Sequence, residues 1–326
     1  MSTVVIAYEL GSSGRQIVHE ALEDVAQAIH LPDLDSAGRA DALRNADAVL
    51  ARTTREFGPG EITLLQNIRL LQFFTAGIDH VPLADLPLGV PVANNAGAYA
   101  APMAEHALGM ALAAAKRLLV EHAALARGEF NQFAPNRMLA GGVCGILGFG
   151  GIGVALARLA RGIGMKVHAI NRRGRSEEPT DWIGTPDELD LLLAASDMLV
   201  ICTPLTPATL GMIGASQLAR MKPDAILVNV ARGEIVDERA LYERLVAFPD
   251  FCACIDAWWI EPVRHGSFRM DQPLLSLPNV LGSPHNSAAG IAETGVMGLQ
   301  RACANIRRVL AGERPLNLVG AEDRMM

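Results

Sequence analysis

The sequence predicts an α/β protein of two domains, and three features carry this prediction. Short apolar runs rich in Val and Ile recur along the chain without polar alternation. Strands of this kind are buried on both faces, as in a parallel sheet that helices cover. Stretches with the apolar spacing of helices lie between these runs. The length of 326 residues is typical of two domains rather than one.

The composition excludes several classes of partner. Half of the residues are hydrophobic, 19% are charged, and the formal net charge is −7. This balance argues against a surface for nucleic acids or anionic membranes, which needs clustered Lys and Arg. The longest apolar stretch, residues 107–115, is too short to span a bilayer. The first ten residues lack the pattern of a signal peptide. We therefore expect a cytoplasmic protein that binds neither nucleic acid nor membrane.

The cysteines point to the same compartment. There are five of them, an odd number, and most fall in apolar runs, so we expect reduced core residues. They are Cys144, Cys202, Cys252, Cys254 and Cys303. The spacing of Cys252 and Cys254 leaves a metal site as an alternative, but strand alternation and the lack of a second pair favour core filling. No metal is expected.

The apolar runs form two blocks. The second block, from about Gly142 to Gly282, holds six expected strands in order, which is typical of a doubly wound Rossmann sheet that binds a dinucleotide. The first block, from Met1 to about Gly97, holds at least three and indicates a smaller flavodoxin-like domain. One long helix, from about Ala101 to Arg127, is expected to carry the chain between the domains, with Pro102 in its first turn.

A glycine motif lies at the start of the second block. The segment Gly148–Gly153 has the pattern G-x-G-x-x-G, follows an expected strand and opens an expected helix. Gly148 would allow a tight turn, Gly150 would let the backbone approach a pyrophosphate, and Gly153 would let the helix pack closely. The N–H groups at the helix start, at Gly151 and Ile152, would bind the phosphates. A glycine-rich turn without a ligand is the alternative.

The end of the next expected strand, "KVHAIN", indicates which dinucleotide is bound. An acidic residue normally accepts the ribose hydroxyls about 20 residues after the glycines. Here the position falls on Asn171, which would not repel a 2′-phosphate, and Arg172, Arg173 and Arg175 follow. Arginines can bind such a phosphate through charge-assisted hydrogen bonds. The pattern favours NADP, with NAD still possible; a solvated basic loop is the alternative.

Three further strand ends carry the chemistry. Arg232 follows the fourth expected strand, Asp256 ends the fifth, with Glu261 shortly after, and His285 follows the sixth. Ligands of such sheets bind at the carboxyl ends of the strands. Reduction of a carbonyl by hydride needs a cation that orients it and a proton donor for the developing alkoxide. Arg232 can bind a carboxylate and the adjacent carbonyl, His285 can donate the proton, and Glu261 can hold the imidazole and favour its protonated form.

Each of these residues taken singly has a simpler interpretation. A lone His beside a Pro is more often a surface residue, and Glu261 before Pro262 could belong to a turn. Their joint position at successive strand ends favours a catalytic set.

The chain resembles the D-isomer-specific 2-hydroxyacid dehydrogenase family over nearly its whole length. This family includes glyoxylate and hydroxypyruvate reductases and the D-lactate, phosphoglycerate and formate dehydrogenases. The motifs that carry the resemblance are "LGFGGIG" (Leu147–Gly153), "TPLTPAT" (Thr203–Thr209), "NVARGEIVD" (Asn229–Asp237), "DAWWIEP" (Asp256–Pro262) and "SPHNSA" (Ser283–Ala288).

The resemblance implies roles for individual residues. Arg232 would bind substrate and take part in catalysis, Glu261 and His285 would form the acid–base dyad, and Ala76 and Gly77 would receive the substrate carboxylate through their N–H groups. Asp256 would meet the nicotinamide amide. The residues implied to line the cofactor are Thr203, Pro204, Thr209, Val230, Ala231, Arg232 and His285.

The resemblance also implies an architecture and an activity. The C-terminal helix, residues 288–311, would return to the first domain. The substrate-binding domain would then comprise residues 1–98 and 290–326, and the Rossmann domain residues 99–289. Members are usually dimers through the cofactor domain and the long helix, so a homodimer is expected. The expected reaction is reduction of a small 2-keto acid, glyoxylate-like or hydroxypyruvate-like, to the D-2-hydroxy acid.

Some points stay open. A nicotinamide-sensing corepressor without catalysis and a formate-type or phosphite-type dehydrogenase share this scaffold. Tyr99 stands where the family often has Asn, which is a departure from the family pattern near the domain boundary. Trp258 and Trp259 either wall the active site or pack the strand end. His265 offers no reason to replace His285 as the catalytic histidine.

Overall fold

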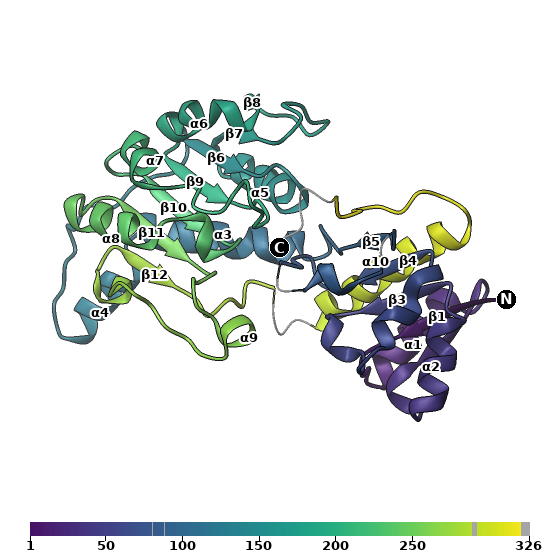
Figure 1. Ribbon diagram of the computed structural model, residues 1–326. Coiled ribbons are helices and arrows are strands. Elements are labelled where there is room, and N and C mark those ends of the chain that lie inside the picture. The colour runs from purple at the N-terminus through teal and green to yellow at the C-terminus, as the bar shows by residue number, and fades with distance from the viewer. Residues whose placement is uncertain (80, 88, 289–291, 321–326) are drawn as a thin grey trace. The chain divides into compact units, whose positions relative to one another are not determined.

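The computed structural model describes residues 1–79, 81–87, 89–288 and 292–320, and the chain divides into two compact units (Figure 1). Unit 1 comprises Met1–Tyr99 and Gly290–Met326, and unit 2 comprises Ala100–Ala289. The division differs by one residue from the predicted one, since Tyr99 belongs to unit 1.

Unit 1 is built on a parallel five-stranded sheet in the order β2-β1-β3-β4-β5. This is the flavodoxin-like strand order, as predicted. The strands are β1 (Ser2–Ile6), β2 (Ala26–His30), β3 (Ala48–Ala51), β4 (Leu70–Phe73) and β5 (Val92–Ala93). The apolar runs "TVVIAY", "DAVLAR" and "LLQFF" predicted β1, β3 and β4, whereas β2 and β5 were not predicted. The polar Gln27 interrupts β2, and β5 is only two residues long, so neither forms a continuous apolar run.

Helices cover both faces of this sheet. The helices of unit 1 are α1 (Ser12–Leu22), α2 (Ser36–Arg44) and α10 (Ala292–Leu310), with the short 3₁₀ helices η1 (Leu31–Asp33), η2 (Thr54–Glu56), η3 (Glu61–Asn67) and η4 (Leu83–Asp85). On one face α10 packs against α1 and β4. On the other α2 packs against η3. The C-terminal helix therefore packs on the first domain, as the resemblance implied. Residues 289–291 of the predicted helix lie outside the described residues.

Unit 2 contains a parallel seven-stranded sheet in the order β12-β11-β10-β9-β6-β7-β8. Its strands are β6 (Val143–Leu147), β7 (Lys166–Ile170), β8 (Trp182–Gly184), β9 (Met198–Ile201), β10 (Ile226–Asn229), β11 (Cys252–Ile255) and β12 (Val280–Gly282). This is the doubly wound order with one strand added beyond β11. The sequence predicted six strands and missed β8, a three-residue strand within a polar stretch. Arg232, Asp256 and His285 therefore follow the fifth, sixth and seventh strands of this sheet, not the fourth, fifth and sixth.

The helices of unit 2 correct one prediction. They are α3 (Ala100–Ala115), α4 (Leu118–Ala126), α5 (Gly151–Gly162), α6 (Leu189–Ala195), α7 (Ala215–Arg220), α8 (Glu238–Ala247) and α9 (Pro262–His265), with η5 (Pro186–Glu188), η6 (Gly233–Ile235) and η7 (Leu274–Ser276). The single helix predicted from Ala101 to Arg127 is wrong, because α3 ends at Ala115 and α4 begins at Leu118. Arg117 has a left-handed backbone with φ of 55°, which a continuous helix cannot accommodate.

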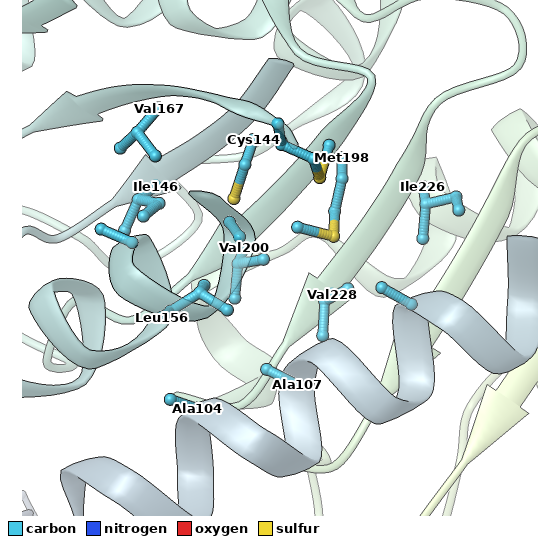
Figure 2. Packing of buried hydrophobic residues seen from close by; sticks show 14 of the residues in the cluster. Ala104, Ala107, Cys144, Ile146, Leu156, Val167, Met198, Val200, Ile226 and Val228 are labelled. Atoms are coloured by element: carbon cyan, nitrogen blue, oxygen red, sulfur yellow. The ribbon is translucent and has the colours of Figure 1, made fainter. Parts of the chain in front are cut away.

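The hydrophobic core of unit 2 joins the helices α3 and α5 to the sheet. Figure 2 shows Ala104 and Ala107 of α3 and Leu156 of α5 packed in one cluster with Val200 and Val228 of the sheet. Alanines on the buried face of α3 let its backbone lie close to α5 and to β10. Because all seven strands run parallel, their carboxyl ends lie along one edge of the sheet. The packed core stabilises this edge.

Three findings concern membrane-spanning helices, metal sites and cysteines. None of the helices in the part of the chain that the structure describes is long and apolar enough to cross a membrane. Within the same residues, no group of three or more His, Cys, Asp and Glu is placed to hold a metal ion. All five cysteines are free thiols, and Cys144, Cys254 and Cys303 are buried.

Candidate active site

The glycine turn lies where the strand order of unit 2 reverses, between β6 and β9. Gly148 has φ of +101°, and a Cβ there would lie 2.6 Å from the backbone nitrogen of Thr203. A Cβ on Gly153 would lie 2.6 Å from the carbonyl oxygen of Gly148. The first glycine therefore permits the turn and the approach of β9, and the second permits close packing of α5. Both contacts agree with the steric roles that the motif predicts.

The start of α5 fits a bound pyrophosphate. A Cβ on Gly150 would meet no atom within 4 Å, so the backbone here is open to close approach. Gly150 is also the N-cap residue, and no side chain in the described chain caps the helix. The N–H groups of the first turn, at Gly151 and Ile152, thus point out of the helix without a capping acceptor. Such a helix start attracts phosphate through its N–H groups and the helix dipole.

Asn171 has a role that the sequence did not predict. It follows β7 directly, and its side-chain oxygen accepts a hydrogen bond of 2.9 Å from the N–H of Arg173. Its amide nitrogen donates to the carbonyl oxygen of Arg175, also at 2.9 Å. The residue therefore folds the arginine-bearing loop, and Arg172 and Arg173 are exposed on it. An Asp could not make the bond to Arg175, because a carboxylate has no N–H to donate.

The side chains of two segments that were implied to line the cofactor, residues 203–209 and residues 230–231, have different roles. The buried hydroxyl of Thr209 accepts from the N–H of Thr206 at 2.8 Å and donates to the carbonyl of Pro204 at 2.7 Å. Thr209 therefore shapes the loop, while Pro204 is exposed and Thr203 is half-buried. Val230 is fully buried and Ala231 nearly so, so these two contribute mainly backbone to the carboxyl edge.

The turn that carries Arg232 is held by its neighbours. Asn229 at the end of β10 donates from its side chain to the Arg232 carbonyl at 2.8 Å and accepts from the Ala231 N–H at 3.0 Å. A Cβ on Gly233 would lie 2.4 Å from the carbonyl carbon of Trp258. Only glycine lets this turn pack against the segment that leads to Glu261. The sequence did not single out Asn229 or Gly233.

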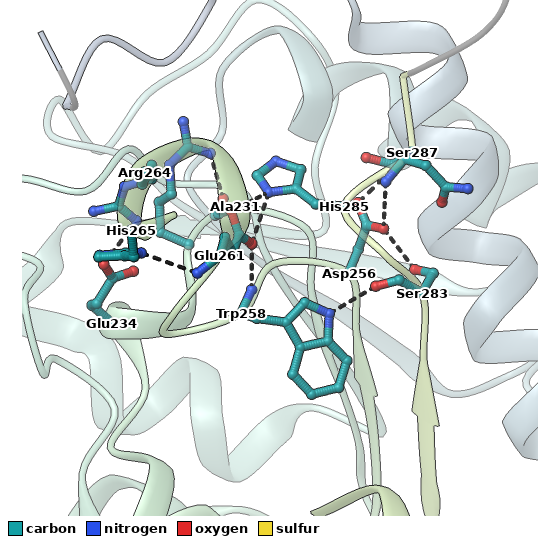
Figure 3. Close-up of polar contacts among 12 residues, drawn as sticks. Ala231, Glu234, Asp256, Trp258, Glu261, Arg264, His265, Ser283, His285 and Ser287 are labelled. Atoms are coloured by element: carbon teal, nitrogen blue, oxygen red, sulfur yellow. Dashed lines mark hydrogen bonds and ion pairs between the residues drawn. The ribbon is translucent and has the colours of Figure 1, made fainter. Parts of the chain in front are cut away.

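Glu261 and His285 form a close pair (Figure 3). The Nδ1 atom of His285 lies 2.9 and 2.8 Å from the two carboxylate oxygens of Glu261, which also accepts from the N–H of Trp258 at 2.7 Å. Burial by itself raises the pKa of Glu261. The hydrogen bonds from His285 and Trp258 and the charge of Arg232 outweigh burial and hold this pKa below its ordinary value. An ionised Glu261 fixes Nδ1 as a donor, so Nε2 is the ring nitrogen that can act on a substrate.

His285 sits on a strained turn. Its φ of 51° lies in the left-handed region, which is costly for a residue with a side chain. The next two N–H groups, of Asn286 and Ser287, donate to the carboxylate of Asp256 at 3.1 and 3.3 Å. The hydroxyl of Ser283 donates to the same carboxylate at 2.6 Å. Asp256 therefore holds the turn on both sides of His285, and its contact with a nicotinamide amide stays a prediction.

The electrostatics of Asp256 follow from these bonds. The residue is fully buried, and burial by itself raises its pKa. The hydrogen bonds from Ser283 and Ser287, together with nearby His106 and His285, outweigh burial, so the pKa of Asp256 is lowered overall.

Neighbouring residues settle three open points. The indole N–H of Trp258 donates to the Ser283 carbonyl at 2.8 Å, and its buried ring packs edge-on against Phe268. The indole of Trp259 donates to the Val236 carbonyl at 2.7 Å. Trp258 thus braces the end of β12, and Trp259 braces the turn that follows η6. His265 accepts the N–H of Glu261 on its Nδ1 at 3.0 Å, which makes it a support for the dyad and not an alternative to His285.

Unit 1 has polar groups at the carboxyl edge of its own sheet. Its loop after β4 contains Ala76 and Gly77, whose N–H groups donate to no backbone carbonyl within the described residues. Two side chains anchor the start of this loop, because the Tyr99 hydroxyl and the Asn95 amide both donate to the Phe74 carbonyl at 3.0 Å. Burial raises the pKa of Tyr99 to about 12, so the hydroxyl remains a donor at neutral pH. Tyr99 therefore anchors the start of this loop through its hydroxyl group.

The lowered pKa of Glu261 predicts how stability depends on pH. Because Glu261 is more acidic in the folded chain, its pair with His285 contributes above the unfolded pKa of about 4 and is lost as the pH falls through the folded value. Glu261→Gln should lower the free energy of unfolding by about 1–3 kcal/mol at pH 7. The difference from the parent should shrink below about pH 4. Urea unfolding at several pH values measures it. The exposed Glu177→Gln serves as control, and a difference that persists unchanged at low pH would refute the ionic pair.

Comparisons with known proteins agree with this geometry. The family model described as D-isomer specific 2-hydroxyacid dehydrogenase, NAD binding domain, matches residues 108–287. The D-3-phosphoglycerate dehydrogenase of Methanocaldococcus jannaschii is 30% identical over 302 residues, which are 91% of this chain and 56% of that protein. This chain therefore spans little more than half of that relative. The glyoxylate reductase of Thermococcus onnurineus is 30% identical over 331 residues, covering 98% of this chain and 96% of that one.

Solved structures show the same relationship. A protein of Pyrobaculum aerophilum, named as a candidate formate dehydrogenase, has a TM-score of 0.81 and 27% identity, with both chains fully covered. A D-isomer specific 2-hydroxyacid dehydrogenase of Xanthobacter autotrophicus Py2, solved with NADPH and MES, has a TM-score of 0.78 and 26% identity over 98% of each chain. The family model matches more than half of the residues of this chain. The chain belongs to the D-isomer specific 2-hydroxyacid dehydrogenases.

Proposed function

We propose that this protein reduces a small 2-keto acid, of the glyoxylate or hydroxypyruvate type, to the D-2-hydroxy acid. The observation that carries the proposal is the ionised Glu261 bound to His285 on the same sheet edge as Arg232 and the open start of α5. Relatives named glyoxylate reductase and hydroxypyruvate reductase support the substrate class at about 30% identity. A corepressor without catalysis has no need for a carboxylate-bound histidine on a strained turn.

The residues divide the chemistry between them. The reduced nicotinamide supplies the hydride that forms the new C–H bond at C2 of the substrate. Arg232 binds the substrate carboxylate and polarises the adjacent carbonyl, because its planar guanidinium can donate two parallel hydrogen bonds. As negative charge develops on the carbonyl oxygen, Nε2 of His285 donates the proton that completes the hydroxyl.

Glu261 makes His285 suited to this task. The carboxylate holds Nδ1 as a donor, so the proton that is transferred must come from Nε2. The backbone N–H of Trp258 donates a hydrogen bond that keeps the carboxylate in place. Oxidation of the hydroxy acid runs through the same groups in reverse, with neutral His285 accepting the hydroxyl proton.

The dinucleotide in this proposal is NADPH, with NADH as the weaker alternative. Its support is the loop that Asn171 folds, since this loop lacks an acidic side chain at the ribose position and exposes two arginines. Solved relatives with NADPH or NADP bound show that the fold accepts the 2′-phosphate.

The role of His285 gives the first kinetic prediction. His285→Ala removes the proton donor and should slow keto-acid reduction by roughly 10²–10⁴-fold, with little change in cofactor affinity. Initial rates with glyoxylate and hydroxypyruvate measure the loss. His19→Ala, at an exposed histidine of α1, should leave the rate unchanged. Near-normal turnover by the His285 variant would exclude it as the donor. A parent that oxidises formate or phosphite, and reduces no keto acid, would exclude the proposed reaction.

The preference for NADPH over NADH gives the second kinetic prediction. One charge-assisted hydrogen bond to a 2′-phosphate contributes about 1.5–3 kcal/mol before solvent exposure reduces it. Arg172→Ala combined with Asn171→Asp should therefore shift the kcat/KM ratio toward NADH by roughly tenfold or more, mainly through KM. Arg220→Ala, on α7, is the matched control. Measuring Arg172→Ala and Asn171→Asp singly separates the lost cation from the altered loop. A parent that already prefers NADH would contradict the proposal.

We also propose that the chain forms a homodimer through the surface of α4 and the segment after it. Large apolar side chains there are more than half exposed, which is unusual for a surface that faces only water. They are Leu118, Leu119, Leu125, Phe130, Phe133 and Met138. Phe130→Ser with Phe133→Ser should raise the dimer dissociation constant at least about tenfold by sedimentation. Leu191→Ser, at a leucine that is also more than half exposed, should leave it unchanged. A parent that sediments as a monomer at micromolar concentration would refute this interface.

A further inference from the structure

A second histidine of unit 2 belongs to the network that holds the His285 turn. His106 lies on α3, and its Nε2 atom is 2.9 Å from the Ser283 hydroxyl oxygen. The same hydroxyl lies 2.6 Å from Oδ1 of Asp256, and His106 Nε2 is itself 3.6 Å from that oxygen. Three elements, α3 and the ends of β11 and β12, are joined by these contacts.

The direction of the hydrogen bonds follows from the atoms present. A serine hydroxyl has one proton, and the ionised carboxylate of Asp256 accepts only, so the proton of Ser283 is directed at Asp256. The hydroxyl oxygen must then accept from His106, which requires a proton on Nε2 of His106. The chain thus runs from His106 through Ser283 to Asp256, and each bond polarises the next.

The same carboxylate carries the bonds that shape the catalytic turn. Asp256 accepts the N–H groups of Asn286 and Ser287, the two residues after His285. A left-handed backbone at His285 persists only when its surroundings over-determine it. A buried carboxylate can supply two such bonds only while it stays ionised and oriented, and the Ser283 bond orients it.

We propose that His106 is a positioning residue for this reaction, acting through Ser283 and Asp256 to hold the turn that presents His285. The inference rests on the proposed function for its kinetic consequence, but not for its structural one. His106 is about one quarter exposed at its side chain and touches neither Glu261 nor His285 in the contacts of the described chain, so its effect must travel through Ser283 and Asp256.

The test uses donor-deleting variants and matched donor-retaining ones. His106→Leu removes the donor, whereas His106→Gln places an amide N–H at a similar reach. Ser283→Ala removes the hydroxyl, whereas Ser283→Thr keeps it. We expect His106→Leu and Ser283→Ala to lower kcat about tenfold, because small displacements of a catalytic group are costly, while the dissociation constant of NADPH changes little. The Gln and Thr variants should restore most of the rate.

Two further readouts separate positioning from general loss of structure. The double variant His106→Leu with Ser283→Ala should be no worse than Ser283→Ala alone, because both break one chain of bonds. Amide hydrogen exchange at Asn286 and Ser287 should be about tenfold faster in the Leu and Ala variants than in the parent, with exchange in β6 unchanged. Additive losses, or unchanged exchange at these two amides, would overturn the proposal. A parent without keto-acid turnover whose exchange still responds would refute the proposed function and leave the role of His106 in place.

Discussion

The parallel sheet of unit 2 imposes the constraint on which the site depends. All of its strands end at one edge, so residues that follow β6, β9, β10, β11 and β12 converge there although they are far apart in the sequence. Convergence brings polar groups into a protein interior, where an unpaired carboxylate is costly. The structure offsets this cost because each buried carboxylate has hydrogen-bond partners. Glu261 binds His285 and the Trp258 amide, and Asp256 binds a hydroxyl and two backbone amides.

The two buried carboxylates act on one histidine from different sides. Glu261 fixes the imidazole ring, and Asp256 fixes the backbone that carries it. A ring held by one carboxylate alone could still move with its loop, and a loop held alone would leave the ring free to rotate. Both are needed to place Nε2 reproducibly, and a proton donor must be placed to within a fraction of an ångström.

Much of this could be predicted from the sequence, and the failures have physical causes. The glycine motif, the strand ends and the dyad are encoded locally, so Gly148, Glu261 and His285 could be found from their spacing. The strands β5 and β8 were missed because two or three residues carry no periodic signal. The break at Arg117 was missed because neither Gly nor Pro stands near this left-handed residue to indicate the end of a helix.

Other parts of the site depend on contacts over long sequence distances. The packing of Gly233 on Trp258 and the bond from His106 to Ser283 join segments 25 and 177 positions apart, and no local pattern reveals them. Asn171 is a different case. Its spacing from the glycines identified the position, but the hydrogen bonds by which it folds the arginine loop are a property of the turn geometry.

Tracing the hydride tests the central claim most directly. Hydroxypyruvate is incubated with the protein and NADPH in which both hydrogens on C4 of the nicotinamide are replaced by deuterium, and the product is examined by NMR and chiral chromatography. Direct transfer to C2, with the proton on oxygen supplied by His285, predicts D-glycerate with deuterium at C2. Unlabelled product, L-glycerate or no product would contradict the assignment of this chain as a reductase of small 2-keto acids.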